Sequence, residues 1–115
     1  MESILRGEIY YADLGDAVGS EQGGHRPVLI LQSDLLNQNS PTVIVVPTTS
    51  IIKLPFLQAH CILPVNRPLR ERSMVLTEQV RAIDRQRLGA YVGRLQAREL
   101  RDVEQALCFS LGLIE

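Results

Sequence analysis

The chain has 115 residues, a length that fits one compact domain able to bury a core without a metal or a disulfide framework. Hydrophobic residues make up 45% and charged residues 22%, which excludes an intrinsically disordered chain. The formal net charge is −1, from 12 basic and 13 acidic residues, so an anionic partner has to be met by a local patch and not by overall attraction. We expect a single domain over residues 1–115.

The first predicted strand covers residues 6–14, whose apolar side chains fall on both faces, as in a strand covered on both sides. Residues 15–24 hold four glycines among small and polar residues and are predicted to form a long loop. Two short aliphatic runs follow, at 28–31 and 43–46. Each run is preceded closely by a proline, which is typical of a fully buried strand with a defined start.

Residues 34–40 are predicted to form a single helical turn that begins at Asp34. Further strands are predicted over 58–65, 73–83 and 88–95, separated by polar, arginine-rich turns. So many short strands within one small chain indicate a curled sheet or a small barrel.

Only the C-terminal segment changes to a helical period, because Leu100, Val103, Leu107 and Leu111 recur on one face. This pattern predicts one amphipathic helix that ends at Gly112. The alternation of strands and helices that a parallel sheet requires is missing from the sequence. The predicted fold class is therefore mainly β, with one C-terminal α-helix.

Several kinds of site are not expected. Cys61 and Cys108 lie in separate apolar runs and are predicted to be two buried thiols. His25 and His60 do not combine with carboxylates or thiols at a ligand spacing, so no metal site is expected. The motifs of nucleotide cofactors and serine hydrolases do not occur, which leaves no expected cofactor. Since no apolar run reaches the ~18 residues of a membrane span, we expect a cytoplasmic protein without a membrane partner.

Two polar segments remain as candidates for chemistry, GSEQGGHRP at 19–27 and PTTS at 47–50. Pro47 cannot donate to a sheet ladder, so it is expected at a strand edge or bulge, where Thr48 and Thr49 can be turned toward a ligand. Taken alone, a glycine loop that only turns and two threonines that only end a strand would account for the same residues.

The chain resembles the MazF/PemK family of bacterial toxins, which are metal-independent endoribonucleases, from Arg6 to Ile114. The motifs that carry the resemblance are RGEIYYADL, GSEQGGHRPVLIL, VVPTTS, EQVRAIDRQRL and the C-terminal ALCFSLGLI, in the family's order. It implies an SH3-like small β-barrel of the CcdB/MazF/Kid type with helices at its side. It also implies a homodimer that cleaves single-stranded RNA at short sequence motifs, as the toxin of a toxin–antitoxin pair with a cognate antitoxin protein.

The same resemblance implies which residues act. The family's functional arginine maps to Arg26 and its functional threonine to Thr49, which are the two expected catalytic residues. Because Thr48 adjoins Thr49, a shift of one residue would exchange them.

The resemblance also implies residues that bind the substrate. Ser20 and Glu21 map to loop positions that line the RNA groove, and Gln79 maps to a pair of residues that faces it. His25 and Thr48, the neighbours of the two expected catalytic residues, complete the expected substrate-binding set.

The chemistry of RNA cleavage suits these residue types. RNA carries its own nucleophile, the 2′-hydroxyl, so cleavage to a 2′,3′-cyclic phosphate and a free 5′-hydroxyl needs no metal to activate water. The Arg26 guanidinium is expected to hold two phosphate oxygens in a bidentate fork and to act electrostatically. Thr49 is expected to orient the same phosphate. Either Glu21 or His25 could remove the 2′-proton, or His25 could pack across the loop and support Arg26.

Two other functions are alternatives to RNA cleavage. A gyrase poison of the same fold would carry a tryptophan close to its C-terminus, and this chain has none. A non-catalytic RNA-binding barrel is disfavoured by the presence of both Arg26 and Thr49.

Two further groups of residues have expected roles. Ile51, Ile52, Leu54 and Phe56 are expected to form an apolar patch that a two-fold contact would cover. The arginines that follow the Gln79 motif are expected to be solvated charges or to steer phosphates, and they are Arg81, Arg85 and Arg87.

Overall fold

The structure is a computed structural model that describes residues 3–52, 54, 57–63, 69 and 71–114. Seven antiparallel strands form one sheet in the order β4-β5-β3-β2-β1-β7, and β6 pairs with β3 outside this path. The predicted mainly β fold with a C-terminal helix is confirmed. The strands are β1 (Glu8–Asp13), β2 (His25–Ile30), β3 (Thr42–Thr49), β4 (His60–Leu63), β5 (Ser73–Leu76), β6 (Arg81–Asp84) and β7 (Leu88–Arg94). The helices are α1 (Asp34–Asn37) and α2 (Ala97–Ser110), and the 3₁₀ turns are η1 (Thr77–Gln79) and η2 (Arg85–Arg87).

Strand β2 is covered on both faces, as its unbroken apolar run predicts. Leu29 joins one core cluster, which extends to Val103 of α2. Val28 and Ile30 point the other way and join a second cluster, to which Val43 of β3 also belongs. All five side chains are fully buried. Burial on both faces fixes the position of β2, whose first residues carry the candidate site.

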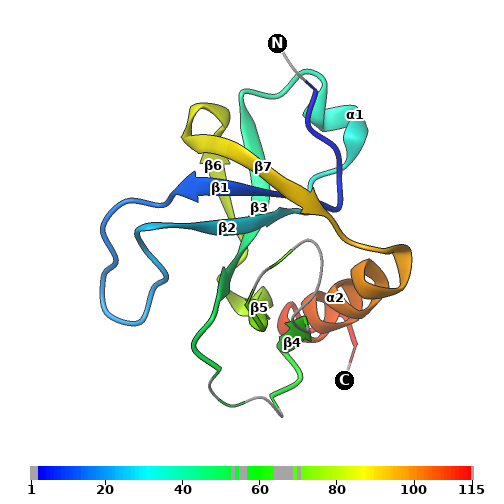
Figure 1. The fold of residues 1–115 in the computed structure, drawn as a ribbon. Coiled ribbons are helices and arrows are strands. Elements are labelled where there is room, and N and C mark those ends of the chain that lie inside the picture. Colours follow the sequence, from blue (N-terminus) through cyan, green and yellow to red (C-terminus); the bar gives the residue numbers. More distant parts are fainter. Residues whose placement is uncertain (1–2, 53, 55–56, 64–68, 70, 115) are drawn as a thin grey trace.

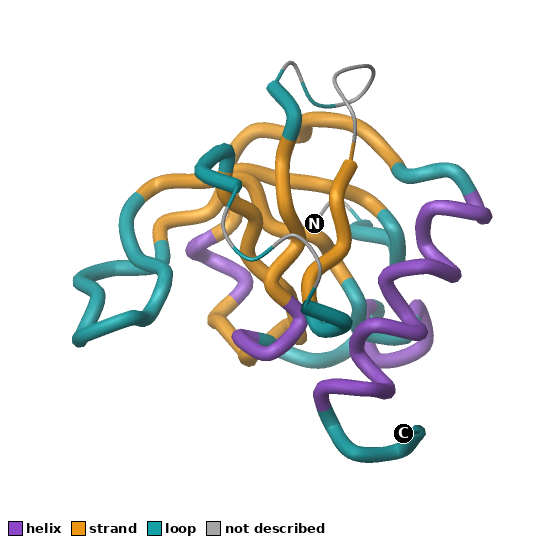
Figure 2. The backbone as a smooth tube through the Cα atoms, turned by 90° about the horizontal axis from the view of Figure 1, so that it is seen from below, coloured by secondary structure: helices purple, strands orange, loops and turns teal. Residues whose placement is uncertain are grey.

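Helix α2 lies beside the strands at one end of the sheet, on the opposite side of the molecule from the β1–β2 loop (Figures 1 and 2). Val103 is buried in the first core cluster, and Leu100 and Leu107 pack against it, which confirms most of the predicted apolar face. Leu111 is the exception, because it caps the helix and is 56% exposed. Gly112 follows with a φ of +74°, the left-handed conformation that ends a helix. No described helix is long and apolar enough to cross a membrane.

The single strand predicted over residues 73–83 is wrong. This segment forms two strands, β5 and β6, with the turn η1 between them. Strand β5 pairs with the end of β3, whereas β6 pairs with its beginning. The apolar residues on both sides of the turn favour strand, and Thr77 in the turn is as deeply buried as the residues of β5. The break is marked in the sequence by the three polar residues of η1.

Pro47 is buried inside β3, opposite Val28 of β2, and not at the edge where it was expected. The other edge of β3 pairs with β6 as far as Val45 and with β5 from Thr48 onward. The proline therefore stands where this edge changes partner, a place where a missing backbone donor costs little. The expected interruption of the ladder is a change of neighbour within one continuous strand.

Helix α1 begins at Asp34, as predicted, and ends at Asn37. Ser33 is its N-cap and accepts a hydrogen bond from the Leu36 amide at 3.4 Å. Asp34 instead accepts a hydrogen bond from the Arg6 amide at 2.7 Å, which ties α1 to the N-terminal segment. The strand predicted over 58–65 is confirmed as β4 for its central residues, and its last two positions lie outside the described residues.

Both cysteines are free thiols that are half-buried, where full burial was predicted. Burial, together with the negative charges of Asp102 and Glu99, raises the pKa of the Cys61 thiol to about 11. Very little of the reactive thiolate therefore exists at neutral pH. Cys61 is suited to packing beside α2 and not to nucleophilic chemistry.

Candidate active site

A groove of about 1290 Å³ runs along the β1–β2 loop, the end of β3 and the turn η1. Residues far apart in the sequence meet in it, because β3 carries its last residues to the loop while η1 follows β5, the neighbour of β3. Every residue that the sequence predicted for the site lines this groove, namely Ser20, Glu21, His25, Arg26, Thr48, Thr49 and Gln79.

Two glycines allow the β1–β2 loop to fold back on itself. A Cβ atom on Gly23 would lie 2.7 Å from the Gly15 carbonyl oxygen and 2.8 Å from the Ala17 nitrogen, so this position accepts only glycine. Gly24 has a φ of +75°, and its amide donates to the Gly15 carbonyl at 2.8 Å. These two glycines therefore allow a close approach between the two ends of the loop.

The Arg26 guanidinium is half-buried and is held by three contacts. Its Nε donates to the Gly23 carbonyl at 2.7 Å. Its Nη1 donates to the Thr48 carbonyl at 3.2 Å and to the Gln22 side-chain oxygen. The first contact closes the loop, and the second joins the loop to β3.

These contacts determine how Arg26 can meet an anion. A guanidinium has five N–H donors, and the three contacts use the single donor of Nε and both donors of Nη1. Within the described part of the chain, no contact uses the two N–H groups of Nη2. Arg26 can therefore meet an anion through Nη2 as it stands, and the expected bidentate fork over two nitrogens, which stays a prediction, would require one of the three contacts to be released.

Gln22 is a site residue that the sequence analysis missed. Its side-chain oxygen accepts a hydrogen bond from Arg26, and its backbone amide donates to the Gln79 side-chain oxygen at 2.7 Å. The Gln79 side-chain nitrogen donates to the Ser20 carbonyl at 3.2 Å. Both ends of the Gln79 amide thus hold the β1–β2 loop, and the signal in the sequence was that a glutamine lies four residues before Arg26, within reach of its side chain.

The structure distinguishes the two adjacent threonines. Thr48 is 2% exposed, and its hydroxyl donates to the Pro27 carbonyl at 2.8 Å. Thr49 is half-exposed at the end of β3, and its hydroxyl accepts a hydrogen bond from the Ile51 amide at 3.1 Å. The Thr49 hydroxyl keeps its own proton for a further acceptor in the groove. Thr48 serves the contact between β2 and β3.

His25 and Arg26 leave β2 on opposite faces, because successive side chains of a strand alternate. The His25 ring stacks on the Tyr11 ring, with centroids 5.2 Å apart and planes 4° apart. Both rings are exposed and line the groove. The stack is with strand β1 and not across the loop, and the role of His25 stays a prediction. Glu21 is exposed, and its carboxylate accepts the Val18 amide at 2.9 Å.

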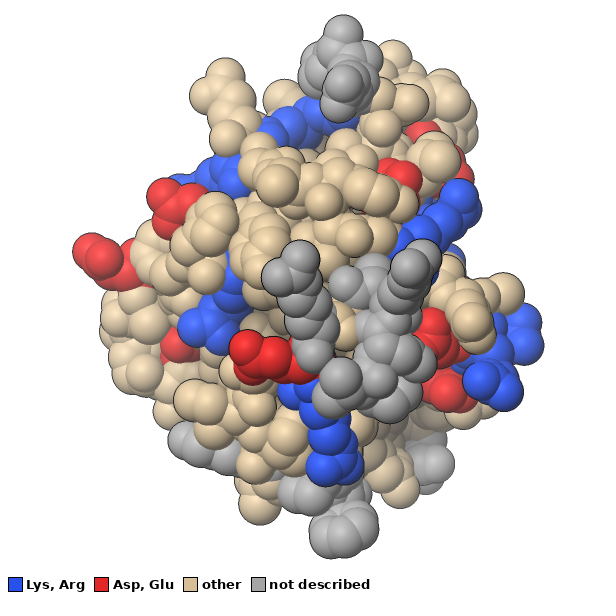
Figure 3. Space-filling model, viewed as in Figure 1, with Lys and Arg blue, Asp and Glu red and all other residues tan. Residues whose placement is uncertain are grey.

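The groove is not uniformly basic. Figure 3 shows basic and acidic side chains scattered over the same face, without one continuous basic patch. Among the described residues, no group of three or more histidines, cysteines and carboxylates gathers closely enough to hold a metal ion. In the part of the chain that the structure describes, the ionisable side chains that line the groove are Glu21, His25, Arg26, His60, Glu71, Glu78 and the phenols Tyr11 and Tyr91. Within this described set, Arg26 is the arginine whose orientation can attract an anion.

The three arginines after the Gln79 motif do not line the groove. Arg81 donates to the Leu14 carbonyl at 3.5 Å, Arg87 donates to the Asp13 carbonyl at 3.1 Å, and Arg85 donates to a carbonyl of α1. These side chains tie separate segments of the backbone together.

Comparison with known proteins gives one consistent result. Residues 5–111 match a family described as PemK-like, MazF-like toxin of type II toxin–antitoxin system. The chain is 44% identical over 113 residues to the endoribonuclease EndoA of Bacillus subtilis, covering 97% of both chains. Its fold resembles MazF from Deinococcus radiodurans, with a TM-score of 0.83, 27% identity and coverage of 97% and 99%. It also resembles a mycobacterial endoribonuclease solved with its cognate antitoxin, with a TM-score of 0.83, 24% identity and coverage of 98% and 99%.

The contrast between the two threonines can be tested by stability. Thr48→Val removes the buried donor to Pro27 and should lower the free energy of unfolding by about 1 kcal/mol. Thr49→Val should change it by less than about 0.5 kcal/mol, because the side chain is half-exposed. Urea unfolding of both variants measures the difference. Equal destabilisation, or a larger loss for Thr49→Val, would contradict the assignment of Thr48 to the β2–β3 contact.

Proposed function

Because the chain belongs to the PemK-like, MazF-like toxin family of type II toxin–antitoxin systems, we propose that it is a sequence-specific endoribonuclease that cleaves single-stranded RNA. The observation that carries the proposal is the aimed guanidinium of Arg26, whose Nη2 is left for a phosphate beside the half-exposed Thr49. The whole chain acts as one toxin domain, and because its substrate is messenger RNA it works in the cytoplasm.

The proposed reaction uses the substrate's own nucleophile. The 2′-oxygen forms a bond to the adjacent phosphorus, and the bond from phosphorus to the 5′-oxygen breaks, which leaves a 2′,3′-cyclic phosphate. The 2′-hydroxyl gives up its proton and the leaving 5′-oxygen takes one up. Arg26 stabilises the extra negative charge on the phosphate oxygens, and Thr49 donates a hydrogen bond to the same phosphate.

The remaining groove residues bind the RNA chain. The exposed stack of His25 on Tyr11 offers an aromatic surface on which an unpaired base can stack. Ser20 and Glu21 lie on the rim formed by the β1–β2 loop, where side chains meet the ribose and base edges. Since His25 and Arg26 leave β2 on opposite faces, the stacked base and the reacting phosphate belong to different parts of the RNA.

The first test concerns the reaction itself. Purified protein should cut single-stranded RNA in excess EDTA, because the 2′-hydroxyl and the side chains above supply the nucleophile and the charge. The downstream products should carry 5′-hydroxyl ends that polynucleotide kinase labels without prior phosphatase treatment. Loss of cleavage in EDTA, or products with 5′-phosphate ends, would refute the proposed chemistry.

The second test concerns Arg26. Arg26→Ala should lower kcat on a short RNA by on the order of 10²–10³, the scale of losing one preorganised charge-stabilising donor. Arg26→Lys should recover only part of this loss, because an ammonium group cannot make the same three contacts and still present a donor to phosphate. Thr49→Val should also lower kcat, and the double variant should lose less than the product of the two single losses, since both residues hold one phosphate.

The matched control for Arg26 is its neighbour on the opposite strand face. His25→Ala should raise KM for RNA and leave kcat within about threefold, because stacking binds the chain without touching the phosphate. Thermal melts confirm that each variant is folded. An Arg26→Ala protein that is folded and cuts at the wild-type rate would remove the reaction from this groove.

We further propose a homodimer that a cognate antitoxin protein binds. The support is the family and the apolar side chains that stay exposed at the end of α2, where Leu111 is 56% and Leu113 is 70% exposed. In the patch expected from the sequence, Ile51 and Leu54 are exposed but line the groove, so we do not place the two-fold contact there. Ile52 is half-buried, and Phe56 lies outside the described residues. Sedimentation at micromolar concentration should give the mass of two chains, and added antitoxin should shift it and stop cleavage. A monomer that remains fully active in the presence of its antitoxin would contradict both parts.

A further inference from the structure

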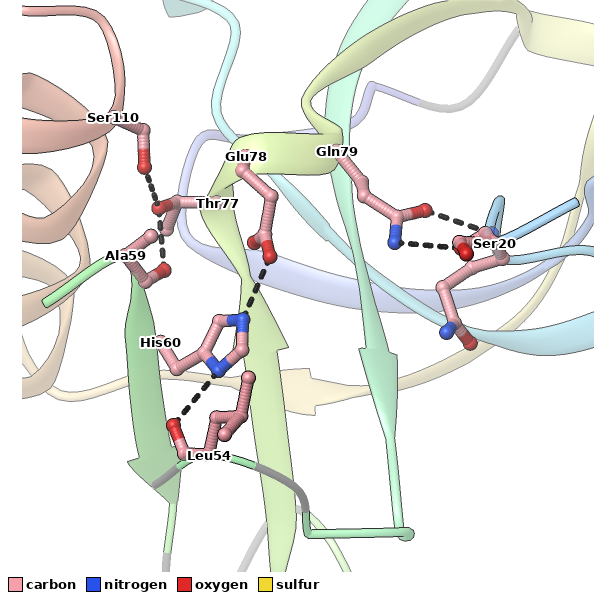
Figure 4. Close-up of polar contacts among 9 residues, drawn as sticks. Ser20, Leu54, Ala59, His60, Thr77, Glu78, Gln79 and Ser110 are labelled. Atoms are coloured by element: carbon pink, nitrogen blue, oxygen red, sulfur yellow. Dashed lines mark hydrogen bonds and ion pairs between the residues drawn. The ribbon is translucent and has the colours of Figure 1, made fainter. Parts of the chain in front are cut away.

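The turn η1 holds several segments around the groove at once (Figure 4). The Thr77 hydroxyl donates to the Ala59 carbonyl at 2.6 Å, which ties η1 to the start of β4. A hydroxyl has one proton, so the 2.7 Å contact between Thr77 and Ser110 must be donated by Ser110 of α2. Gln79 binds the β1–β2 loop through both ends of its amide. The middle residue of the turn, Glu78, reaches in another direction.

Glu78 binds the ring of His60. The Nε2 atom of His60 lies 2.6 Å from the Glu78 carboxylate, and its Nδ1 atom lies 3.1 Å from the Leu54 carbonyl oxygen. A carbonyl oxygen only accepts, so the Nδ1 atom carries the proton that is donated to Leu54, and Nε2 shares a hydrogen bond with the Glu78 carboxyl group. The His60 side chain is 6% exposed, and the Glu78 side chain is 40% exposed. Both ring nitrogens are thus held, one by Leu54 and one by Glu78, at the wall of the groove.

The far end of this pair holds the segment between β3 and β4. Leu54 has a φ of +48°, a conformation that leucine rarely adopts without support from its surroundings. Its carbonyl oxygen accepts hydrogen bonds from the His60 ring and from the Leu57 amide, the latter at 3.0 Å. The Leu54 and Ile51 side chains are 69% and 64% exposed, and both line the groove together with Arg26. Exposed apolar side chains on a polar groove are suited to packing against base faces.

We propose that His60 and Glu78 are positioning residues that hold Leu54 as the second wall of the groove, facing the RNA bases, while Gln79 holds the first wall. This inference rests on the proposed cleavage of RNA. One three-residue turn thereby sets the distance between the β1–β2 loop, which carries the reaction, and the apolar segment, which contacts bases.

Kinetics on a short RNA test this positioning role with three variants. His60→Gln keeps a donor near the Nε2 position but loses the contact with Leu54, and it should raise KM about tenfold while kcat stays within about threefold. His60→Asn keeps a donor near the Nδ1 position and should recover part of the KM. Glu78→Gln replaces the carboxylate partner of Nε2 by an amide, whose neutral hydrogen bond holds the ring less firmly, and should also raise KM. In the His60→Gln background, Glu78→Gln should change KM by less than about twofold, since Glu78 acts only through His60.

The control variant is Glu104→Gln. Its carboxylate pairs with Arg6 at 2.7 Å and is 39% exposed, close to the exposure of Glu78, but neither residue lines the groove. KM and kcat of this variant should equal those of the wild type. Hydrogen exchange gives a readout that needs no RNA, because the Leu57 amide donates to the Leu54 carbonyl. The Leu57 amide should exchange about tenfold faster in His60→Gln and at the wild-type rate in Glu104→Gln.

The outcomes separate this inference from the proposed function. Wild-type KM in folded His60→Gln and Glu78→Gln proteins overturns the inference, as does a fall in kcat at constant KM. If His60→Gln melts at too low a temperature to assay, the isosteric and more exposed Glu78→Gln decides the matter alone. A wild-type protein that cuts no RNA overturns the proposed function and this inference with it, whereas faster exchange at Leu57 would still show that His60 holds the segment.

Discussion

The orientation of one guanidinium governs what this groove can do. Arg26 spends three of its five N–H donors on two backbone carbonyls and on Gln22, so it cannot turn freely toward solvent. A charge that is already aimed costs no reorganisation when negative charge develops on a phosphate. The groove carries carboxylates as well as this arginine, and the net charge of the chain is −1. Under the proposed function, the aim of Arg26 is what we expect to hold the phosphate in this groove.

The sheet supplies the frame that keeps this aim. Strand β3 pairs with β2 on one edge, and its other edge passes from β6 to β5 around Pro47. The pairing with β2 brings the end of β3, with Thr48 and Thr49, beside the start of β2, with Arg26. The pairing with β5 places η1, which follows β5, next to the β1–β2 loop. Burial of β2 on both faces keeps the frame from shifting.

Much of this arrangement could be predicted from the sequence, and the failures have physical causes. Apolar runs located the strands, and the period of Leu100, Val103 and Leu107 located α2, because burial patterns are local signals. The turn η1 was missed because the apolar residues on both sides of it favour strand, although Thr77, Glu78 and Gln79 are three polar residues in a row. The contact of His60 with Glu78 is set by long-range packing, which no spacing rule reports, whereas the contact of Gln22 with Arg26 joins residues only four apart. The family resemblance named the residues of the groove, but their division into aimed, supporting and buried groups required the coordinates.

The most direct test is a crystal structure of the protein with a short RNA that has a 2′-deoxy nucleotide at the cleavage position and so cannot react. The account predicts that an oxygen of the phosphate after this nucleotide lies about 3 Å from both Arg26 Nη2 and the Thr49 hydroxyl. The Nε and Nη1 contacts of Arg26 should persist in the complex. A complex in which Arg26 abandons the Thr48 and Gly23 carbonyls, or in which this phosphate lies outside the groove, would contradict it.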